Sequence, residues 1–456
     1  MTFSKVLVAN RGEIATRIIR SLKEAGIRAA AIYSEADKDS LPVQIVDEAY
    51  PIGPPPASKS YLNGPRIVDL AKQIKAEAIH PGYGFLAENS EFASLCEDAG
   101  IAFIGPTPEN LKLAGDKRRA RQMVEDARIP VIPGSHKALL SLPETREVCQ
   151  RIGYPMMLKA SAGGGGRGMR VVKDESALKE EFFMAAAEAR AAFGDPTLYM
   201  ERFIQNPRHI EVQILGDGKG KVIHLMERNC SIQRRHQKLI EEAPSPSLPN
   251  SLRESIHEAA VRIAQKINYR NAGTVEFLVD EENHFYFMEI NARIQVEHPV
   301  TEMISGIDLI KAQISIAAGD GLDLKQSEVA RWGYAIECRI NAEDPEEGFT
   351  PSPGTIQEYR PPGGFGVRFD THLFRGYEVP MYYDSLLGKL ITWGRTREDA
   401  IRTMDRALQE LTIVPLKTTV PFHLQVIRQD DFLKGTYRLD LVEQILGPEV
   451  DREEED

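Results

Sequence analysis

The chain has 456 residues, of which 42% are hydrophobic and 27% charged, and its formal net charge at pH 7 is −11. At roughly 150 residues per domain, this length predicts about three domains of ordinary globular composition. The negative charge argues against nucleic acid as a partner, since the nearest approach to a basic tract is "RRHQK" at 234–238. No apolar segment has the length of a signal peptide or a membrane span, so we expect a cytoplasmic protein that contacts no membrane.

Residues 5–37 have the pattern strand, turn, helix, strand. "VLVA" is apolar, and Ile14, Ile18 and Leu22 recur at helical spacing before a glycine and a second apolar run. Similar units continue to residue 106, so we predict that the first third is α/β with a doubly wound parallel sheet. The first turn, "NRGE", has a single glycine, which argues against a dinucleotide-binding fingerprint.

Beyond about residue 115 the pattern changes to mixed α+β. A helix is predicted to end near Arg128, because Pro130 follows, and another is predicted over 185–193. The cysteines make no C-x-x-C pair, which predicts buried, reduced thiols rather than a zinc or redox motif. Mostly antiparallel strands are predicted at 198–204, 209–217 and 221–233, and a third section begins near residue 330 with a strand at 333–342.

The stretch "KASAGGGGRGMR" at 159–170 has glycine at 163–166 and 168, between two strand-like runs. Gly168 precedes Met169 rather than the Lys-Ser/Thr pair of a P-loop. We predict the tip of a hairpin whose backbone N–H groups cover polyphosphate, with Lys159 adding positive charge. A disordered surface loop is the alternative.

The most informative segment is "TVEFLVDEENHFYFMEINARIQVEHPVTE" at 274–302, which begins with two strands joined by a polar turn at 280–283. Side chains alternate along strands, and an even-length turn pairs residues of opposite parity. One face, predicted to be core, then carries Val275, Phe277, Val279, Tyr286, Met288 and Ile290. The other face carries Glu276, Leu278, Phe285, Phe287, Glu289 and Asn291.

Glu276, Glu289 and Asn291 would then lie within about 5–8 Å of one another. Two acids this close repel, and one would be protonated unless a cation lay between them. All-oxygen ligands select a hard ion, so we predict a Mg²⁺ or Mn²⁺ site of the kind that also binds substrate phosphates. A solvated face with a different register is the alternative.

The hairpin is followed by Arg293, Gln295, Glu297 and His298. Pro299 disfavours helix in the residue before it, so an extended loop is predicted rather than a helical ion pair. On such a loop an arginine can clamp a small anion and a carboxylate can take its proton. Metal, phosphate cover and anion clamp together predict ATP-driven activation of a small acid.

These residues belong to a wider resemblance. The sequence resembles the biotin carboxylase component of biotin-dependent carboxylases, of the acetyl-CoA carboxylase or the pyruvate carboxylase type, in the ATP-grasp superfamily. The likeness runs through nearly the whole chain, and the joint order of the matching strings makes it specific. The strings are "VLVANRGEIATRIIR", "IHPGYGFLAEN", "FIGP", "GDK", "LKASAGGGGRGM", "NPRHIEVQ", "ERNCSIQRRHQK", "NARIQVEHPVTE", "ECRINAEDP", "TPSPG", "GGFGVR" and "YYDSLLGKL".

The resemblance implies four segments. They are an N-terminal Rossmann-like pre-ATP-grasp domain over 1–114, an ATP-grasp domain over 115–330 with a lid at about 132–204, a C-terminal biotin carboxylase domain over 331–446, and an acidic tail over 447–456. The implied reaction forms carboxyphosphate from ATP and bicarbonate and then transfers CO₂ to N1 of biotin.

The resemblance also implies roles for single residues. In the nucleotide site it places Lys117, Lys159, Gly163, Gly164, Gly165, Gly166, Glu201, Arg202, Ile204, His209, Gln233, His236, Glu276 and Glu289. Mg²⁺ or Mn²⁺ would be bound by Glu276, Glu289 and Asn291. Bicarbonate would be held by Lys238, Arg293, Gln295 and Val296 and deprotonated by Glu297. Arg339 would stabilise the biotin enolate, and Tyr83 would line the biotin pocket.

Three departures from the family pattern matter. Ala292 stands where we expect threonine, but between the proposed ligands it would point the other way. Leu439 stands where acetyl-CoA carboxylase subunits usually carry a histidine near adenine, which favours the pyruvate carboxylase type. No Met-Lys pair occurs, so biotin would arrive on a separate carrier protein. Further implied are a homodimer and a carboxyltransferase subunit.

Two other functions remain open at this point. A different ATP-grasp ligase, such as the carbamoyl-phosphate type, also passes through carboxyphosphate. A catalytically silent scaffold is the other alternative, and it would be expected to lose a metal ligand or the base. The presence of Glu276, Glu289, Asn291, Arg293 and Glu297 argues against it.

Overall fold

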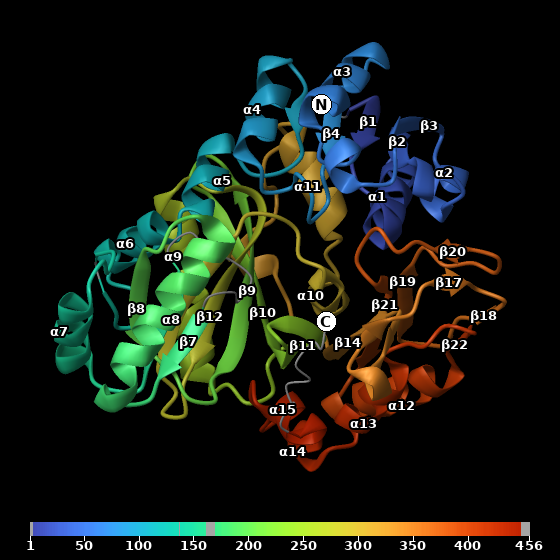
Figure 1. Cartoon of the computed structure of the whole chain (residues 1–456). Helices are drawn as coiled ribbons and strands as arrows, with labels where there is room; N and C mark the ends of the chain where they lie inside the picture. Colours follow the sequence, from blue (N-terminus) through green and yellow to red (C-terminus); the bar gives the residue numbers. More distant parts are fainter. Residues whose placement is uncertain (1–2, 136, 161–168, 448–456) are drawn as a thin grey trace.

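The computed structural model describes residues 3–135, 137–160 and 169–447. Its N-terminal part is a five-stranded parallel sheet with strand order β3-β2-β1-β4-β5, drawn in blue in Figure 1. The strands are β1 (Lys5–Val8), β2 (Arg28–Ser34), β3 (Glu48–Gly53), β4 (Ala78–His80) and β5 (Ala102–Phe103). The helices are α1 (Gly12–Glu24), α2 (Leu41–Ile45), α3 (Gly64–Gln73) and α4 (Ser90–Asp98).

Helices cover both faces of this sheet. Val6 and Val8 of β1 pack in one buried cluster with Ile14 of α1, whereas Leu7 packs in another with Ile67 of α3 and Phe92 of α4. This split follows from the alternation of side chains along a strand that is buried on both faces. The prediction of a doubly wound parallel sheet is therefore confirmed.

A smaller three-stranded antiparallel sheet follows, with order β7-β6-β8. Strand β6 pairs with β7 from Met156 opposite Val172 to Lys159 opposite Met169, which is the pairing expected for the two arms of a hairpin. The predicted tip, with Gly163–Gly166 and Gly168, lies outside the described residues. The strands are β6 (Met156–Ala160), β7 (Met169–Val172) and β8 (Leu198–Arg202), and the nearby helices are α5 (Pro108–Gly115), α6 (Lys117–Asp126), α7 (Leu142–Ile152) and α8 (Glu175–Phe193).

The centre of the molecule is an eight-stranded antiparallel sheet with order β13-β12-β9-β10-β11-β14-β21-β19 (Figure 1). Its strands are β9 (Arg208–Asp217), β10 (Val222–Arg234), β11 (Gln237–Ala243), β12 (Arg270–Val279), β13 (Phe285–Asn291), β14 (Tyr334–Asn341), β19 (Val367–Thr371) and β21 (Leu386–Gly394). The remaining helices are α9 (Asn250–Lys266), α10 (His298–Ser305), α11 (Leu309–Ala317), α12 (Arg397–Glu410), α13 (Val420–Ile427), α14 (Asp430–Lys434) and α15 (Leu441–Leu446).

This sheet joins the middle of the chain to its C-terminal part, because β11 pairs with β14 from Ile240 opposite Cys338 to Ala243 opposite Ala335. Charged side chains from both parts consequently share one sheet face. Three short two-stranded ladders complete the C-terminal part. They are β15 (Glu343–Asp344) with β16 (Thr350–Pro351), β17 (Gly354–Thr355) with β20 (Glu378–Val379), and β18 (Glu358–Arg360) with β22 (Thr412–Val414).

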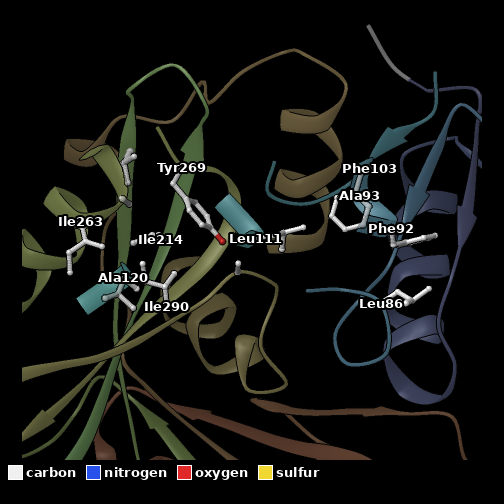
Figure 2. Packing of buried hydrophobic residues seen from close by; sticks show 14 of the residues in the cluster. Leu86, Phe92, Ala93, Phe103, Leu111, Ala120, Ile214, Ile263, Tyr269 and Ile290 are labelled. Carbon is white, nitrogen blue, oxygen red and sulfur yellow. The ribbon is translucent and has the colours of Figure 1, made fainter. Parts of the chain in front are cut away.

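One hydrophobic cluster connects the two large sheets. Figure 2 shows Phe92 and Phe103 on the N-terminal side, Leu111 of α5 between, and Tyr269 and Ile290 on the other side. All of these side chains are buried, so the cluster is continuous across the boundary. Burial of this kind stabilises by about 25 cal/mol per Å² of apolar surface, which ties the position of the N-terminal sheet to that of the central one.

Two predictions about environment can be compared with the structure. All four cysteines, Cys96, Cys149, Cys230 and Cys338, are buried and free of disulfides, as predicted. No described helix combines the length and the apolar character that crossing a membrane requires.

The predicted hairpin at 274–302 forms as β12 and β13, but its two faces were predicted wrongly in part. The observed turn is one residue longer, because Val279 pairs with Phe285, and a bulge at Met288 then restores the expected parity. Phe285 and Phe287 therefore pack against Phe277 in the core, with ring centroids 5.6 and 6.4 Å away. Tyr286 and Met288 were predicted as core and are half-buried.

Candidate active site

The end of the hairpin with the predicted metal ligands lies beyond the bulge and has the predicted parity. Glu276 stands directly opposite Glu289, and Asn291 stands opposite Thr274. The amide of Asn291 donates from Nδ2 to Glu276 Oε1 at 2.7 Å and lies 3.5 Å from Glu289 Oε1. The two carboxylates and the amide therefore converge as predicted.

Lys117, the first residue of α6, reaches this group from the side. Its Nζ lies 3.0 Å from Glu289 Oε2. Burial lowers the pKa of Lys117, but the adjacent charge of Glu289 outweighs this and raises it. A positive charge beside the carboxylate predicted to bind metal is the arrangement expected where a polyphosphate and a divalent ion meet.

Lys238 of β11 is the centre of the buried charges. Its Nζ lies 2.5 Å from Glu211, 3.0 Å from Glu276 and 2.7 Å from Glu297. Burial alone would lower the pKa of Lys238, but these three carboxylates raise it well above its usual value. The amine is therefore charged at neutral pH and holds acids from three elements together.

Arg228 of β10 is fully buried and lies on the other side of Glu211 from Lys238 in this chain of ion pairs. It pairs with Glu211 and donates to Gln213 at 2.8 Å and Thr301 at 2.9 Å. Burial raises the pKa of Glu211, but Arg228 and Lys238 together bring it down to about 2. Glu211 is thus ionised at neutral pH and helps to orient Lys238.

His209 of β9 links Glu276 of β12 to Gln233 of β10. Its Nε2 lies 2.9 Å from Glu276 Oε2, and Gln233 Nε2 lies 2.8 Å from its Nδ1. An amide that donates to Nδ1 fixes the tautomer with the proton on Nε2, which then faces the carboxylate. Burial raises the pKa of Glu276, yet Lys238 and His209 hold it well below its usual range.

Glu297 occupies the N-cap position of α10, where its side chain makes no capping hydrogen bond, and it is fully buried. One oxygen lies 2.7 Å from Lys238 Nζ, and the other lies 2.9 Å from Arg339 Nη2. Burial and the charge of Glu211 raise the pKa of Glu297, but these two cations outweigh them and lower it. The carboxylate is ionised at neutral pH and can accept a proton.

Arg293 lies on the loop before α10 and is oriented by its neighbours. Its Nε donates to Glu88 at 3.0 Å, its Nη1 to Gln295 Oε1 at 2.6 Å and its Nη2 to Asn291 Oδ1 at 3.2 Å. The guanidinium thus contacts Asn291, one of the predicted metal ligands, on one side and Gln295 of the loop on the other. The predicted loop is confirmed for Arg293, Gln295 and Glu297 but is wrong for His298, which is the first residue of α10 because Pro299 is tolerated in the first turn of a helix. Glu88 was not predicted from the sequence.

Lys159 of β6 and Glu201 of β8 form a pair on the smaller sheet. Lys159 Nζ lies 2.6 Å from Glu201 Oε2, and Arg121 of α6 lies 2.5 Å from the other oxygen. Of the neighbouring predicted residues, Arg202 has an exposed side chain 3.4 Å from the carbonyl of Ile152, and Ile204 is half-buried. The glycines predicted to cover ATP lie outside the described residues.

The β10–β11 turn carries His236, which is exposed and has a positive φ of 64°. A positive φ is uncommon outside glycine and occurs where surrounding structure enforces it. The turn presents His236 at the surface, whereas Gln233 of the same hairpin points inward to His209.

Tyr83 lies at the junction with the N-terminal sheet. Its hydroxyl donates to Glu13, whose carboxylate also pairs with Lys389 at 3.1 Å. Lys389 in turn donates to the carbonyl of Val296 at 2.9 Å. A cavity of about 110 Å³ lies beside Tyr83 and Glu13 and extends to Asp384.

Sequence reasoning missed several charged residues that surround this site. They are Glu13, Glu88, Glu211, Arg228, Glu241, Glu337 and Lys389. A signal for them exists, since acidic and basic residues alternate with apolar ones in "HIEVQIL" and "AIECRI", although the predicted strands are buried on both faces. A charge at such a position must have a partner from another strand.

Family models match the chain in three consecutive segments. Residues 2–111 match the N-terminal domain of biotin carboxylase, residues 116–325 match the ATP-binding domain of the carbamoyl-phosphate synthase L chain, and residues 337–444 match the biotin carboxylase C-terminal domain. With the fold and the buried acid and base groups, these matches define an ATP-grasp enzyme.

Similar proteins narrow this class. A biotin carboxylase from Nostoc is 54% identical over 98% of this chain and 100% of its own length. A pyruvate carboxylase subunit from Methanothermobacter thermautotrophicus is 51% identical over 97% of this chain and 90% of its own. The biotin carboxylase domain dimer of Hydrogenobacter thermophilus 2-oxoglutarate carboxylase, crystallised with MgADP, ADP and bicarbonate, has a TM-score of 0.92 and is 51% identical, with 97% and 98% of the chains covered.

The chain therefore belongs to the biotin carboxylase family. Its activity is that of an ATP- and bicarbonate-dependent biotin carboxylase, as found in multisubunit carboxylases.

Proposed function

We propose that this chain forms carboxyphosphate from MgATP and bicarbonate and transfers CO₂ to biotin carried on a separate protein. The observation that supports this best is the setting of Glu297. Its carboxylate is ionised, and it lies between Lys238 and Arg339, next to the convergent group of Glu276 and Asn291. A base, two cations and a metal-binding group therefore lie within one buried network.

The bicarbonate site would be built around Lys238 and the loop before α10. Arg293 is held by Glu88 and Gln295 in an orientation that leaves it beside Asn291. With the Val296 backbone, these groups would hold bicarbonate through its oxygens while Glu297 takes its proton. Arg339 would then stabilise the negative charge that develops on the biotin enolate oxygen.

A divalent ion fits the residues at the metal end of the hairpin. Glu276, Glu289 and Asn291 offer only oxygen ligands, and Glu289 is partly exposed toward the side from which Lys117 approaches. In this structure Asn291 Nδ2 donates to Glu276 and Lys117 Nζ pairs with Glu289, so a donor group lies against each carboxylate at this end of the hairpin. When bound, Mg²⁺ or Mn²⁺ supplies charge neutralisation for the phosphates of ATP.

The remaining nucleotide contacts are proposed along one path. Lys159 and Glu201 lie on the smaller sheet, and His209, Gln233 and His236 lie on β9 and the β10–β11 hairpin. The proposal keeps Arg202, Ile204 and Gly163, Gly164, Gly165 and Gly166 in this set. Tyr83, beside its cavity, would line the biotin pocket.

Partners and location follow from the same proposal. A biotin carboxyl carrier protein would deliver biotin and a carboxyltransferase subunit would use the product, while a homodimer is supported by the crystallised dimer of the Hydrogenobacter domain. A cytoplasmic location is supported by four buried cysteines without disulfides. We further propose domain limits at 1–114, 115–330 and 331–446, with the lid at about 132–204 and the acidic tail at 447–456.

The direct test is ATP hydrolysis by the purified chain with Mg²⁺, with and without bicarbonate and free biotin. Stimulation that needs both substrates is expected. Turnover indifferent to biotin would favour a carbamoyl-phosphate type of ligase, and no turnover with free biotin or with a biotinylated carrier would contradict the proposal.

A further inference from the structure

Two acidic side chains face each other across β11 and β14, outside the set of residues given a role above. Glu241 pairs directly with Glu337 in the antiparallel register, so both lie on the same face of the sheet. Two positions along, Ala243 and Ala335 on this face pack against Val300 of α10. Both glutamates are buried, with at most 1% of their surface exposed.

The oxygens of this pair are unevenly bonded. Glu241 Oε1 accepts from Arg339 Nε at 2.6 Å. The other oxygen of Glu241 and both oxygens of Glu337 have no hydrogen-bond partner among the described residues. Three buried, unpartnered carboxylate oxygens would be costly if both acids were ionised. One proton on Glu337, donated to the free oxygen of Glu241, would give each acid a partner.

Among the described residues, the cations near the pair are also bonded to other groups. Lys238 on β11 is bonded to Glu211, Glu276 and Glu297. Arg339 on β14 is shared between Glu241 and Glu297, and Lys389 on β21 is bonded to Glu13 and the Val296 carbonyl. On α10, burial lowers the pKa of His298, which keeps it neutral, and its N-cap Glu297 adds a negative charge. The surroundings therefore favour a neutral acid opposite Glu241.

The pKa directions agree with this geometry. Burial raises the pKa of Glu337 well above its usual value, against the opposing charge of Lys389 and with a further rise from the charge of Glu241. Burial also raises the pKa of Glu241, to about 7, although Arg339 acts in the opposite direction. Two coupled acids of this kind lose their protons in two steps that belong to the pair.

We propose that Glu241 and Glu337 share one proton at neutral pH, and that Glu337 is a positioning residue which holds Arg339 against Glu297 by way of Glu241. The inference rests on the proposed function only for the role of Arg339. As pH rises, the shared proton is lost, two adjacent carboxylates repel each other, and the guanidinium is no longer held in one place. Turnover should therefore fall on the alkaline side.

The first test detects the proton itself. Infrared spectra of the full chain at neutral pH should show the C=O stretch of a protonated carboxylic acid, and Glu337→Gln should remove it. Glu358→Gln, at an exposed position of β18, is the matched control and should leave the band in place. A wild-type spectrum without the band, or an unchanged band in Glu337→Gln, would overturn the proposal whether or not the chain turns over biotin.

The second test measures the effect on Arg339. Glu337→Gln keeps an N–H donor and no charge, so its turnover at neutral pH should stay within about twofold of wild type while the alkaline decline disappears. Glu337→Leu removes the donor and should lower kcat/KM for biotin about tenfold with KM for ATP unchanged. An alkaline decline that persists in Glu337→Gln would refute the positioning role. If the wild type showed no biotin-dependent turnover, the proposed function would fail, and the infrared result would still decide the shared proton.

Discussion

The two large sheets are buried to a similar degree but have opposite contents. In the N-terminal sheet the buried strand residues are almost all apolar, and His80 is the exception on β4 that can carry a charge. In the central sheet β9 alone buries His209, Glu211 and Gln213 between apolar neighbours. The first sheet is stabilised by the burial of apolar surface, whereas the second also depends on the pairing of charges between strands.

This difference predicts how each sheet responds to change. An apolar core relaxes partly around a lost side chain, and its effect on stability stays local. A charge removed from a paired buried network leaves its partner uncompensated, which affects every group that shares that partner. Substitutions in the central sheet should therefore alter both folding and chemistry, while those in the N-terminal sheet should alter folding alone.

The largest effect is expected for Glu297→Gln. The amide cannot take the bicarbonate proton, so biotin-dependent turnover should fall by roughly 10²–10⁴-fold. ATP binding should survive, because Glu297 lies on the Lys238 and Arg339 side of the site. Steady-state kinetics and ATP titration of the same preparation check both parts, with Glu358→Gln as the control. Unchanged turnover would rule out Glu297 as the base.

Arg228→Met is the next largest case. The substitution leaves Glu211 with Lys238 as its remaining cation and removes the donor from Gln213 and Thr301. Breaking a buried pair in this way costs about 3–5 kcal/mol of unfolding free energy. Urea unfolding measures it against Arg402→Met, whose side chain is 74% exposed. Equal unfolding midpoints for the two variants would contradict the view that the central sheet depends on paired charges.

The same contrast explains which parts of the structure could be predicted from the sequence. In the N-terminal third, continuous apolar runs coincide with the observed β1 and β2, because burial on two faces requires apolar residues throughout a strand, and a period-3.6 apolar pattern coincides with α1. The convergence of Glu276, Glu289 and Asn291 was also predicted, from the alternation of side chains along the two strands, and Glu276 does stand opposite Glu289. The roles of Lys238, Arg339 and Tyr83 came only from family resemblance.

Two kinds of feature could not be read from the sequence. The turn is one residue longer than predicted, which reversed the faces of Phe285 and Phe287, and the bulge at Met288 restored the parity beyond them. No residue type in the sequence indicates either extra residue. The partners of buried charges come from distant strands, as with Glu241 and Glu337, which are 96 positions apart in the chain. Their pairing depends on the order of strands in the sheet, which local patterns do not specify.

Leu7→Ala tests the apolar side of the comparison. Leu7 is fully buried in β1, and its loss should lower the unfolding free energy by about 3 kcal/mol, within the range for large-to-small core changes. Below the melting temperature, kcat and KM should match wild type, because no charge in the central sheet loses a partner. Leu62→Ala, at a side chain 44% exposed, is the matched control. A lower kcat with normal stability would show that the two sheets are not separable in this way.

The smallest effect concerns His80, the buried titratable group of the N-terminal sheet's β4. Burial, with a smaller contribution from Arg17, lowers the pKa of His80 to about 3, whereas the unfolded chain titrates near the ordinary value of 6.5. Between these values the unfolded state binds more protons, so stability is lost as pH falls below about 6.5. At pH 5 the loss amounts to about 2 kcal/mol, from roughly 1.36 kcal/mol per unit of separation.

Urea unfolding at pH 7 and pH 5 measures this loss. His372 and His423 are also buried with lowered pKa values and add to it, while the raised pKa values of Glu241 and Glu337 oppose it. The informative quantity is therefore the difference between wild type and His80→Gln, which should lose about 2 kcal/mol less on acidification. His284→Gln, at a side chain 62% exposed, should behave as wild type. If His80→Gln and wild type lost the same unfolding free energy between pH 7 and pH 5, His80 would make no pH-dependent contribution to stability. The N-terminal sheet would then differ even more clearly from the central sheet.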